Sequence, residues 1–136
     1  MAVRYMLDTD VSSYLIRGTD HALNQKVAAK AGRLCMSSIT YHELLYGARA
    51  RGSAHIESAI SALAELAPVV TFSPDAADRA AAIRSSLDGA GKTIGVMDAL
   101  IAASAMAENC ILVTNNTAHF SRVQGLKIEN WTSPRD

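Results

Sequence analysis

Four polar residues lie just beyond segments that should end at one side of a folded domain. Three of them come after apolar runs typical of buried strands, and the fourth comes after a glycine-rich loop. Asp8 ends the run AVRYML, and Glu43 lies in the helical pattern that follows LCM. Asp98 begins the helical pattern after GAGKTIG, and Asn116 follows CILVT. Carboxylates held a few ångströms apart repel and raise one another's pKa unless a cation lies between them. An oxygen-only set of this kind, if folding gathers it, predicts bound Mg²⁺ or Mn²⁺.

The elements that would position these residues alternate along the chain. The predicted strands are residues 2–7, 34–36, 68–72 and 110–114, with a fifth at 126–128. One predicted helix begins near residue 11. Five further predicted helices span about 20–31, 38–51, 54–66, 75–88 and 97–108. This alternation indicates an α/β fold with a mainly parallel sheet of four or five strands and helices on its faces. Ligands in such folds bind beyond the carboxyl ends of the strands, so the four polar residues should meet at one edge.

Each residue also has an ordinary structural explanation. Asp8, Thr9 or Asp10 can cap the helix that follows, and we expect Asp10 to be the cap. Thr40 and Glu43 have the spacing of a capping box.

The later positions have ordinary explanations as well. Asp98 suits the start of any helix because of the helix dipole. Asn115 and Asn116 are common turn formers. The argument for function therefore depends on all four positions sharing one edge of the sheet.

Composition and charge narrow the class of protein. The 136 residues carry 13 Lys and Arg against 13 Asp and Glu, so no net field attracts nucleic acid or an anionic membrane. The length and the 49% hydrophobic content predict a single domain over residues 1–136. Cys35 and Cys110 lie among apolar residues, which predicts buried free thiols in a reducing compartment. Because no apolar run approaches the ~20 residues of a spanning helix, we expect a cytoplasmic protein.

Five stretches together carry a resemblance to a known family. They are MLDTD (6–10), SSITYHELLYGA (37–48), GVMDALIAASA (95–105), LVTNNTAHFSRVQGL (112–126) and ENW (129–131). Over almost its full length the chain resembles PIN-domain ribonucleases, specifically the VapC toxins of VapBC toxin–antitoxin pairs. The resemblance implies a PIN-like three-layer α/β/α fold, with Asp8, Glu43 and Asp98 as metal ligands.

The chain departs from the family at one position of the site. Many relatives have a fourth acid where this chain has Asn116, which completes the expected catalytic set with Asp8, Glu43 and Asp98. An amide supplies no charge, so a second metal should bind more weakly. Relatives commonly have Asn at the position of Asp10, and a carboxylate there could partly offset the lost charge.

Other side chains near these positions could support the chemistry. Thr9 and Thr114 lie beside the ends of the first and fourth strands, where their hydroxyls could orient the carboxylates. Lys92 in the glycine loop, together with Arg49 and Arg51 beyond Glu43, are candidates for binding RNA phosphates. Solvated surface charge is the ordinary explanation for each of these three cations.

The resemblance also implies an activity and partners. The activity is metal-dependent endonucleolytic hydrolysis of RNA, with tRNA as the expected substrate, including the anticodon stem-loop of initiator tRNA, and with inhibition of translation as the result. The implied cofactor is Mg²⁺ or Mn²⁺. The implied partners are a VapB-like antitoxin and a second copy of the chain, in a homodimer and in a toxin–antitoxin hetero-oligomer.

Two other functions remain open from the residues. A haloacid-dehalogenase-like phosphatase would use Asp8 as nucleophile and Asp10 as acid/base. Two features count against the phosphatase. Ser12 lies one residue away from the position where such phosphatases have a hydroxyl after the DxD motif, and no paired acidic motif follows a later strand. A non-catalytic interaction module would use the acids as helix caps and the alanine-rich helix faces to bind a partner.

Overall fold

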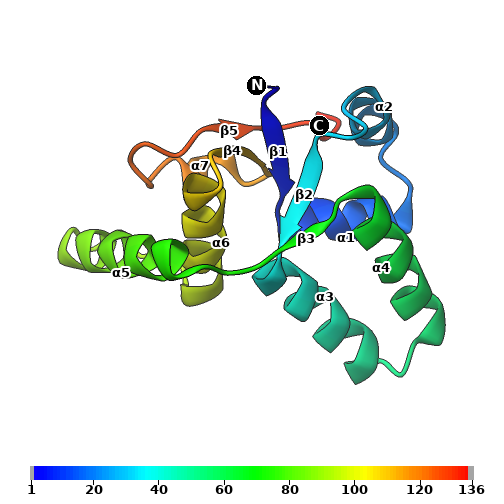
Figure 1. Cartoon of the computed structure of the whole chain (residues 1–136), viewed down its shortest axis with the longest axis horizontal. Helices are drawn as coiled ribbons and strands as arrows, with labels where there is room; N and C mark the ends of the chain where they lie inside the picture. The colour runs from blue at the N-terminus through cyan, green and yellow to red at the C-terminus, as the bar shows by residue number, and fades with distance from the viewer. Residues whose placement is uncertain (1, 135–136) are drawn as a thin grey trace.

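The computed structural model describes residues 2–134 and has an α/β fold (Figure 1). The strands are β1 (Arg4–Leu7), β2 (Leu34–Ser37), β3 (Val69–Val70), β4 (Cys110–Val113) and β5 (Ile128–Glu129). The helices are α1 (Thr9–Arg17), α2 (His21–Ala29), α3 (Ser38–Ala50), α4 (Ala54–Leu66), α5 (Pro74–Gly89), α6 (Val96–Ala107) and α7 (Thr117–Phe120). The predicted alternation of strands and helices is therefore confirmed.

The sheet is entirely parallel, with the strand order β3-β2-β1-β4-β5. The chain begins at the central strand β1, builds β2 and β3 outward on one side, and then crosses over to form β4 and β5 on the other side. The direction of building thus reverses between β1 and β4. Such a switch point leaves a crevice beyond the carboxyl ends of the two strands, where ligands bind in open parallel sheets.

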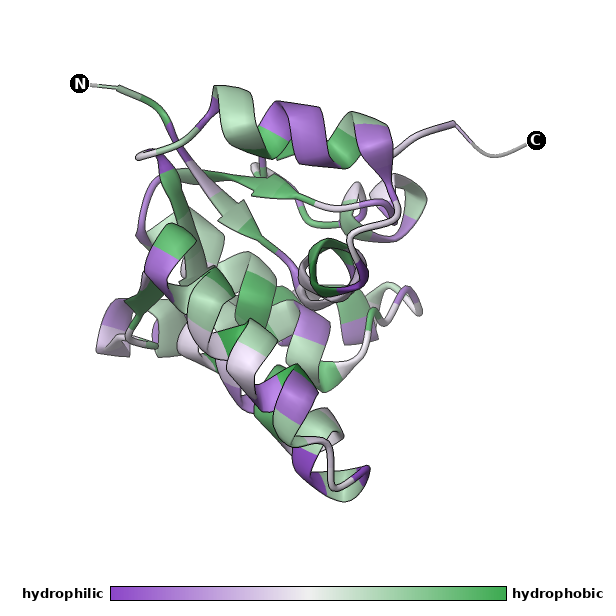
Figure 2. Ribbon diagram, turned by 90° about the vertical axis from the view of Figure 1, so that its right-hand side faces the viewer, coloured by the Kyte–Doolittle hydropathy of each residue, from purple (hydrophilic) through white to green (hydrophobic). Residues whose placement is uncertain are grey.

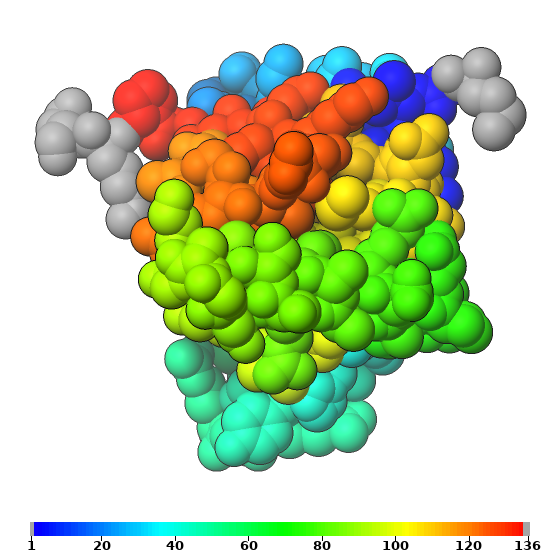
Figure 3. Space-filling model, turned by 90° about the vertical axis from the view of Figure 1, so that its left-hand side faces the viewer, coloured from blue at the N-terminus to red at the C-terminus, as the bar shows by residue number. Residues whose placement is uncertain are grey.

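Alternating side chains of each strand enter different cores, because successive residues of a strand point to opposite faces. Tyr5 and Leu7 pack with buried residues of α1–α4, whereas Met6 packs with buried residues of α5–α7. Figure 1 shows these helix groups on opposite sides of the sheet, and Figure 3 shows α5 lying across the outside of the second group. In Figure 2 the strands are largely hydrophobic, whereas the helices mix hydrophobic and hydrophilic residues. The expected three layers are confirmed.

The helices α1 and α3 begin at Thr9 and Ser38, close to the predicted starts near residues 11 and 38, but their caps differ from those considered. Asp8, not Asp10, is the N-cap of α1, and its carboxylate accepts a hydrogen bond from the Val11 amide over 2.8 Å. The expectation for Asp10 was wrong because α1 already begins at Thr9, which places Asp10 inside the first turn.

The alternative explanation of Thr40 and Glu43 as a capping box is also wrong. The N-cap of α3 is Ser37, whose hydroxyl accepts from the amide of Ile39. Thr40 is therefore already helical, and Glu43 lies in the second turn, where its carboxylate cannot reach the cap.

Smaller differences occur at the edges of the sheet. The strand β3 has only two residues, β5 begins at Ile128, and the single-turn helix α7 was not predicted. Cys35 and Cys110 are buried free thiols, as expected, with their sulfur atoms 3.8 Å apart. None of the helices within residues 2–134 is long and apolar enough to cross a membrane.

Candidate active site

A pocket of about 140 Å³ opens beyond the carboxyl ends of β1 and β4, at the switch point of the sheet. All four residues of the expected catalytic set line it. The lining residues are Asp8, Thr9, Asp10, Glu43, Asp98, Asn116 and Phe120. The prediction that these positions converge on one edge is confirmed, since they come from four different segments of the chain.

Asp8 is the most buried acid of the pocket, with 4% of its surface exposed. Burial above all, with smaller contributions from the negative charges of Asp10 and Asp98, raises the pKa of Asp8 to about 7. Hydrogen bonds from the Thr114 hydroxyl and from the Val11 amide oppose this shift. The pocket therefore holds a poorly solvated carboxylate on which the negative charges of Asp10 and Asp98 also act.

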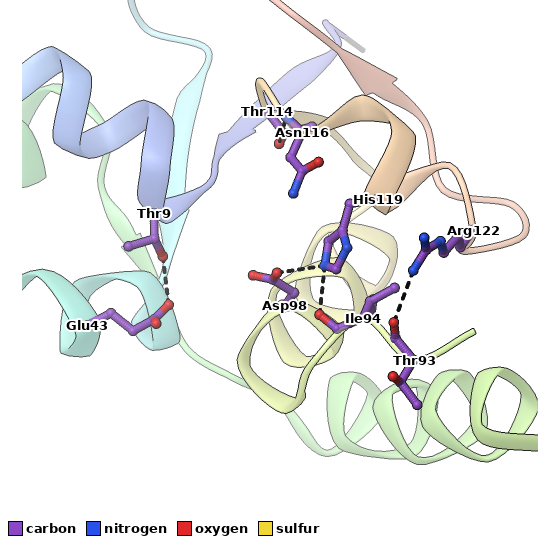
Figure 4. Close-up of polar contacts among 9 residues, drawn as sticks. All are labelled: Thr9, Glu43, Thr93, Ile94, Asp98, Thr114, Asn116, His119 and Arg122. Carbon is purple, nitrogen blue, oxygen red and sulfur yellow. Dashed lines mark hydrogen bonds and ion pairs between the residues drawn. The ribbon is translucent and has the colours of Figure 1, made fainter. Parts of the chain in front are cut away.

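Asp98 lies in the first turn of α6, and its carboxylate meets the imidazole of His119 (Figure 4). The Nε2 atom of His119 is 2.9 Å from Oδ2 of Asp98 and 2.7 Å from the carbonyl oxygen of Ile94. Burial raises the pKa of Asp98, while the hydrogen bond and the charge of His119 lower it in part. Asp98 is thus held by a neighbour that the sequence pattern did not select.

Glu43 is held from the other side of the pocket. The hydroxyl of Thr9 donates to Oε1 of Glu43 over 2.7 Å and lies 3.3 Å from the hydroxyl of Thr40. Figure 4 shows this pair on one side and Asp98 with His119 on the other. The orienting role expected for Thr9 is thus supported by a contact, and its target is Glu43.

Residues 114–116, which follow β4, form the wall of the pocket that lies at the top in Figure 4. The Thr114 hydroxyl accepts from the amide of Asn116 over 3.0 Å, and it also hydrogen-bonds Asp8. Asn116 precedes α7, and its side-chain amide points toward the space beside Asp98 in Figure 4. Asn115 turns the other way, where its amide nitrogen contacts the hydroxyl of Tyr14 over 3.2 Å.

The oxygen-rich lining suits a hard divalent cation, because such ions bind carboxylates and retain water. The charges of Asp10 and Asp98 both act on Asp8, and a cation among them would relieve this repulsion. Within residues 2–134, however, no three acidic, His or Cys side chains are close enough to hold one ion together. The charge of Asp10 thus acts on both Asp8 and Asp98, while the carboxylate of Glu43 is hydrogen-bonded to Thr9.

The three candidate phosphate-binding cations lie in different surroundings. Arg51 lines a groove of about 270 Å³ that shares Thr9 and Glu43 with the acidic pocket. Arg49 instead pairs with Glu57 on the surface, with Nε 3.1 Å from the carboxylate. Lys92 lines a separate hollow beside α5. Of the three, Arg51 is thus the one that adjoins the pocket.

Sequence reasoning missed His119 because the four histidines of the chain show no ligand spacing. The available signal was the distance from Asn116, since residues three apart share a face of one helical turn. That signal requires residues 117–120 to be helical, and the sequence of two asparagines indicated a turn instead.

Comparison with known proteins places this pocket in a family. A family model described as PIN domain matches residues 5–126, which include every residue lining the pocket. The chain belongs to the PIN-domain family. Among curated relatives, Ribonuclease VapC2 of Haemophilus influenzae is 38% identical over 95% of this chain and 98% of its own. The tRNA(fMet)-specific endonuclease VapC of Shigella flexneri is 33% identical over 96% and 99%.

Solved structures agree with the PIN assignment. VapBC2 from Rickettsia felis, bound to a DNA fragment from their promoter, matches with a TM-score of 0.89 and 31% identity, covering 95% of this chain and 99% of that one. VapBC-1 from nontypeable Haemophilus influenzae matches with a TM-score of 0.84 and 32% identity, over 96% and 100%. Membership of the PIN family, with VapC relatives along nearly the whole chain, disfavours the phosphatase alternative.

Proposed function

We propose that this PIN-domain protein is a VapC-type ribonuclease toxin that cleaves RNA with a divalent metal ion at the acidic pocket. The observation that carries the proposal is the buried Asp8, whose raised pKa and acidic neighbours call for a positive charge at the switch point of the sheet. The names of the curated relatives, ribonuclease and tRNA endonuclease, support the choice of reaction.

Each polar residue of the pocket has a distinct role in this proposal. Asp8 and Asp98 hold Mg²⁺ or Mn²⁺, and Glu43 completes the ligand set or accepts a proton from the attacking water. A bound divalent ion supplies positive charge that offsets the scissile phosphate and acidifies water. Thr9 and Thr114 orient Glu43 and Asp8 through their hydrogen bonds. Asn116 can accept or donate a hydrogen bond but adds no charge.

The proposed substrate is tRNA, with the anticodon stem-loop of the initiator as the first candidate, and cleavage there would inhibit translation in the cytoplasm. The name of the Shigella flexneri relative supports this choice. The proposed regulator is a VapB-like antitoxin, because the similar solved structures are VapBC complexes. We also propose a homodimer, since a chain of zero net charge needs a second subunit to extend a cationic groove.

The test uses the purified full chain with tRNA and with a generic RNA, in EDTA, Mg²⁺ and Mn²⁺. We expect discrete cleavage that requires metal and that falls by at least about 100-fold in Asp98→Asn. Asp78→Asn is the matched control, because it neutralises an exposed acid of α5 away from the pocket.

Two other results would replace the proposal. Turnover of p-nitrophenyl phosphate that is lost in Asp10→Asn would favour a phosphatase. An interaction module would be favoured if millimolar Mn²⁺ left the melting temperature unchanged in both the parent and Asp8→Ala, and if no RNA were cleaved.

A further inference from the structure

The imidazole of His119 joins Asp98, the proposed metal ligand, to the backbone of the loop before α6. Its Nε2 atom lies 2.7 Å from the carbonyl oxygen of Ile94 and 2.9 Å from Oδ2 of Asp98. A carbonyl oxygen can only accept, so Nε2 must carry a hydrogen atom. The same N–H is therefore shared with the carboxylate, and Nε2 cannot at the same time serve as a metal ligand.

The orientation of the ring is fixed by its surroundings. The ring of Phe120 meets it edge to face, at 87° and 5.4 Å between centroids. Phe120 is buried and lines the acidic pocket. Only 22% of the His119 side chain is exposed, against 40% of the Asp98 side chain. The imidazole is thus the more constrained partner, and the carboxylate is the one whose position depends on the contact.

The first turn of α6 has no side-chain cap of its own. Its N-cap is Gly95, which has a positive φ of 89° and no side chain to cap the helix. Two side chains from the segment after β4 secure this loop, His119 at Ile94 and Arg122 at the carbonyl oxygen of Thr93 over 3.2 Å (Figure 4). They differ in one respect, because His119 also contacts Asp98 and Arg122 does not.

We propose that His119 is a positioning residue that holds one carboxylate oxygen of Asp98 through Nε2–H and thereby directs the other oxygen to the metal. The inference rests on the proposed function. In this role His119 does not contact the substrate and does not transfer a proton. Partners of this kind typically contribute about 10- to 100-fold to metal affinity when they orient a ligand.

The experiment measures Mn²⁺ affinity by calorimetry and RNA cleavage as a function of Mn²⁺ concentration. We expect His119→Ala to weaken Mn²⁺ binding by about 10- to 100-fold while kcat at saturating Mn²⁺ stays within about threefold of the parent. His119→Gln keeps an N–H donor near the position of Nε2, so its affinity should stay near the parental value. His119→Asn, whose amide is too short to reach Asp98, replaces the alanine variant if that one fails to fold.

Arg122→Ala is the matched control, because it removes the other support of the loop but no contact with Asp98. Its Mn²⁺ affinity should stay near that of the parent. In the Asp98→Asn background, His119→Ala should cause no further loss of affinity, since both changes act through one carboxylate.

Each contrary result has a distinct meaning. Parental Mn²⁺ affinity in His119→Ala would overturn the proposal, as would an equal loss in Arg122→Ala, which would leave only a role in loop stability. A glutamine variant that binds Mn²⁺ normally but loses kcat would show that His119 transfers a proton, and would also overturn it. Parental affinity in Asp98→Asn would instead overturn the metal site of the proposed function.

Discussion

The hydroxyl of Thr9 donates a hydrogen bond to Oε1 of Glu43 over 2.7 Å, although the residues lie 34 positions apart. The bond joins the first turn of α1 to the second turn of α3 on one side of the acidic pocket. It holds Glu43 at the wall of the pocket, on the side opposite Asp98 and His119 (Figure 4). The contact therefore supports the orienting role that we propose for Thr9.

This contact makes Thr9 a measurable contributor to the site. Thr9→Val keeps the shape of the side chain but removes the donor, so we expect RNA cleavage to fall by roughly tenfold. Thr9→Ser keeps the hydroxyl and should retain most of the activity. Cleavage rates of both variants at equal Mn²⁺ check the prediction, and equal losses in the two would argue that packing, not the hydrogen bond, matters here.

Asp8 should make the stability of the metal-free protein depend on pH. Its pKa rises from 3.8 to about 7 on folding, so between these values the folded state binds more protons than the unfolded state. Stability therefore falls as pH rises through this window, by up to about 4 kcal/mol at 1.36 kcal/mol per pKa unit. Urea unfolding in EDTA at pH 4 and pH 8 measures the effect.

Asp8→Asn is the informative variant for that measurement. Asparagine caps a helix as well as aspartate does, so the hydrogen bond to Val11 can persist. We expect the variant to be more stable than the parent at pH 8 in EDTA and to lose stabilisation by Mn²⁺. A steep pH dependence that survives in Asp8→Asn would assign it to another group.

Asn116→Asp should restore negative charge at the upper wall of the pocket. We expect Mn²⁺ affinity to rise by roughly tenfold, or a second ion to bind, because carboxylate charge strengthens such sites. Asn115→Asp adds the same charge one residue away, outside the pocket lining, and should leave metal binding near that of the parent. Calorimetry gives both affinity and stoichiometry, and identical curves for the two variants would remove Asn116 from the site.

Arg51 and Arg49 should differ in their effect on RNA binding. Arg51 lines the groove next to Glu43, whereas Arg49 is engaged by Glu57. In a cleavage-deficient Asp98→Asn background, Arg51→Ala should weaken RNA binding by roughly three- to tenfold and lower the salt slope by about 1. Arg49→Ala should change little. Similar losses in both would indicate a diffuse electrostatic effect in place of a contact in the groove.

The sequence by itself determined the fold class and the four polar residues of the expected catalytic set that meet in the pocket. Strand and helix periodicities are local, and the carboxyl ends of parallel strands share one edge, so the pattern alone was enough to place Asp8, Asp98 and Asn116 together. The assignment to the PIN family came separately, from the resemblance of five stretches of the chain to that family.

The tertiary structure alone decided which side chain holds which. The Thr9–Glu43 and His119–Asp98 contacts join residues 34 and 21 positions apart, and no local pattern encodes such distances. The choice of Asp8 over Asp10 as the cap of α1 depends on the backbone angles of a single residue, with Asp8 extended at ψ 177°. Side-chain hydrogen bonds form only where packing has brought the partners within about 3 Å, so they follow from the fold and not from the periodicity that predicts it.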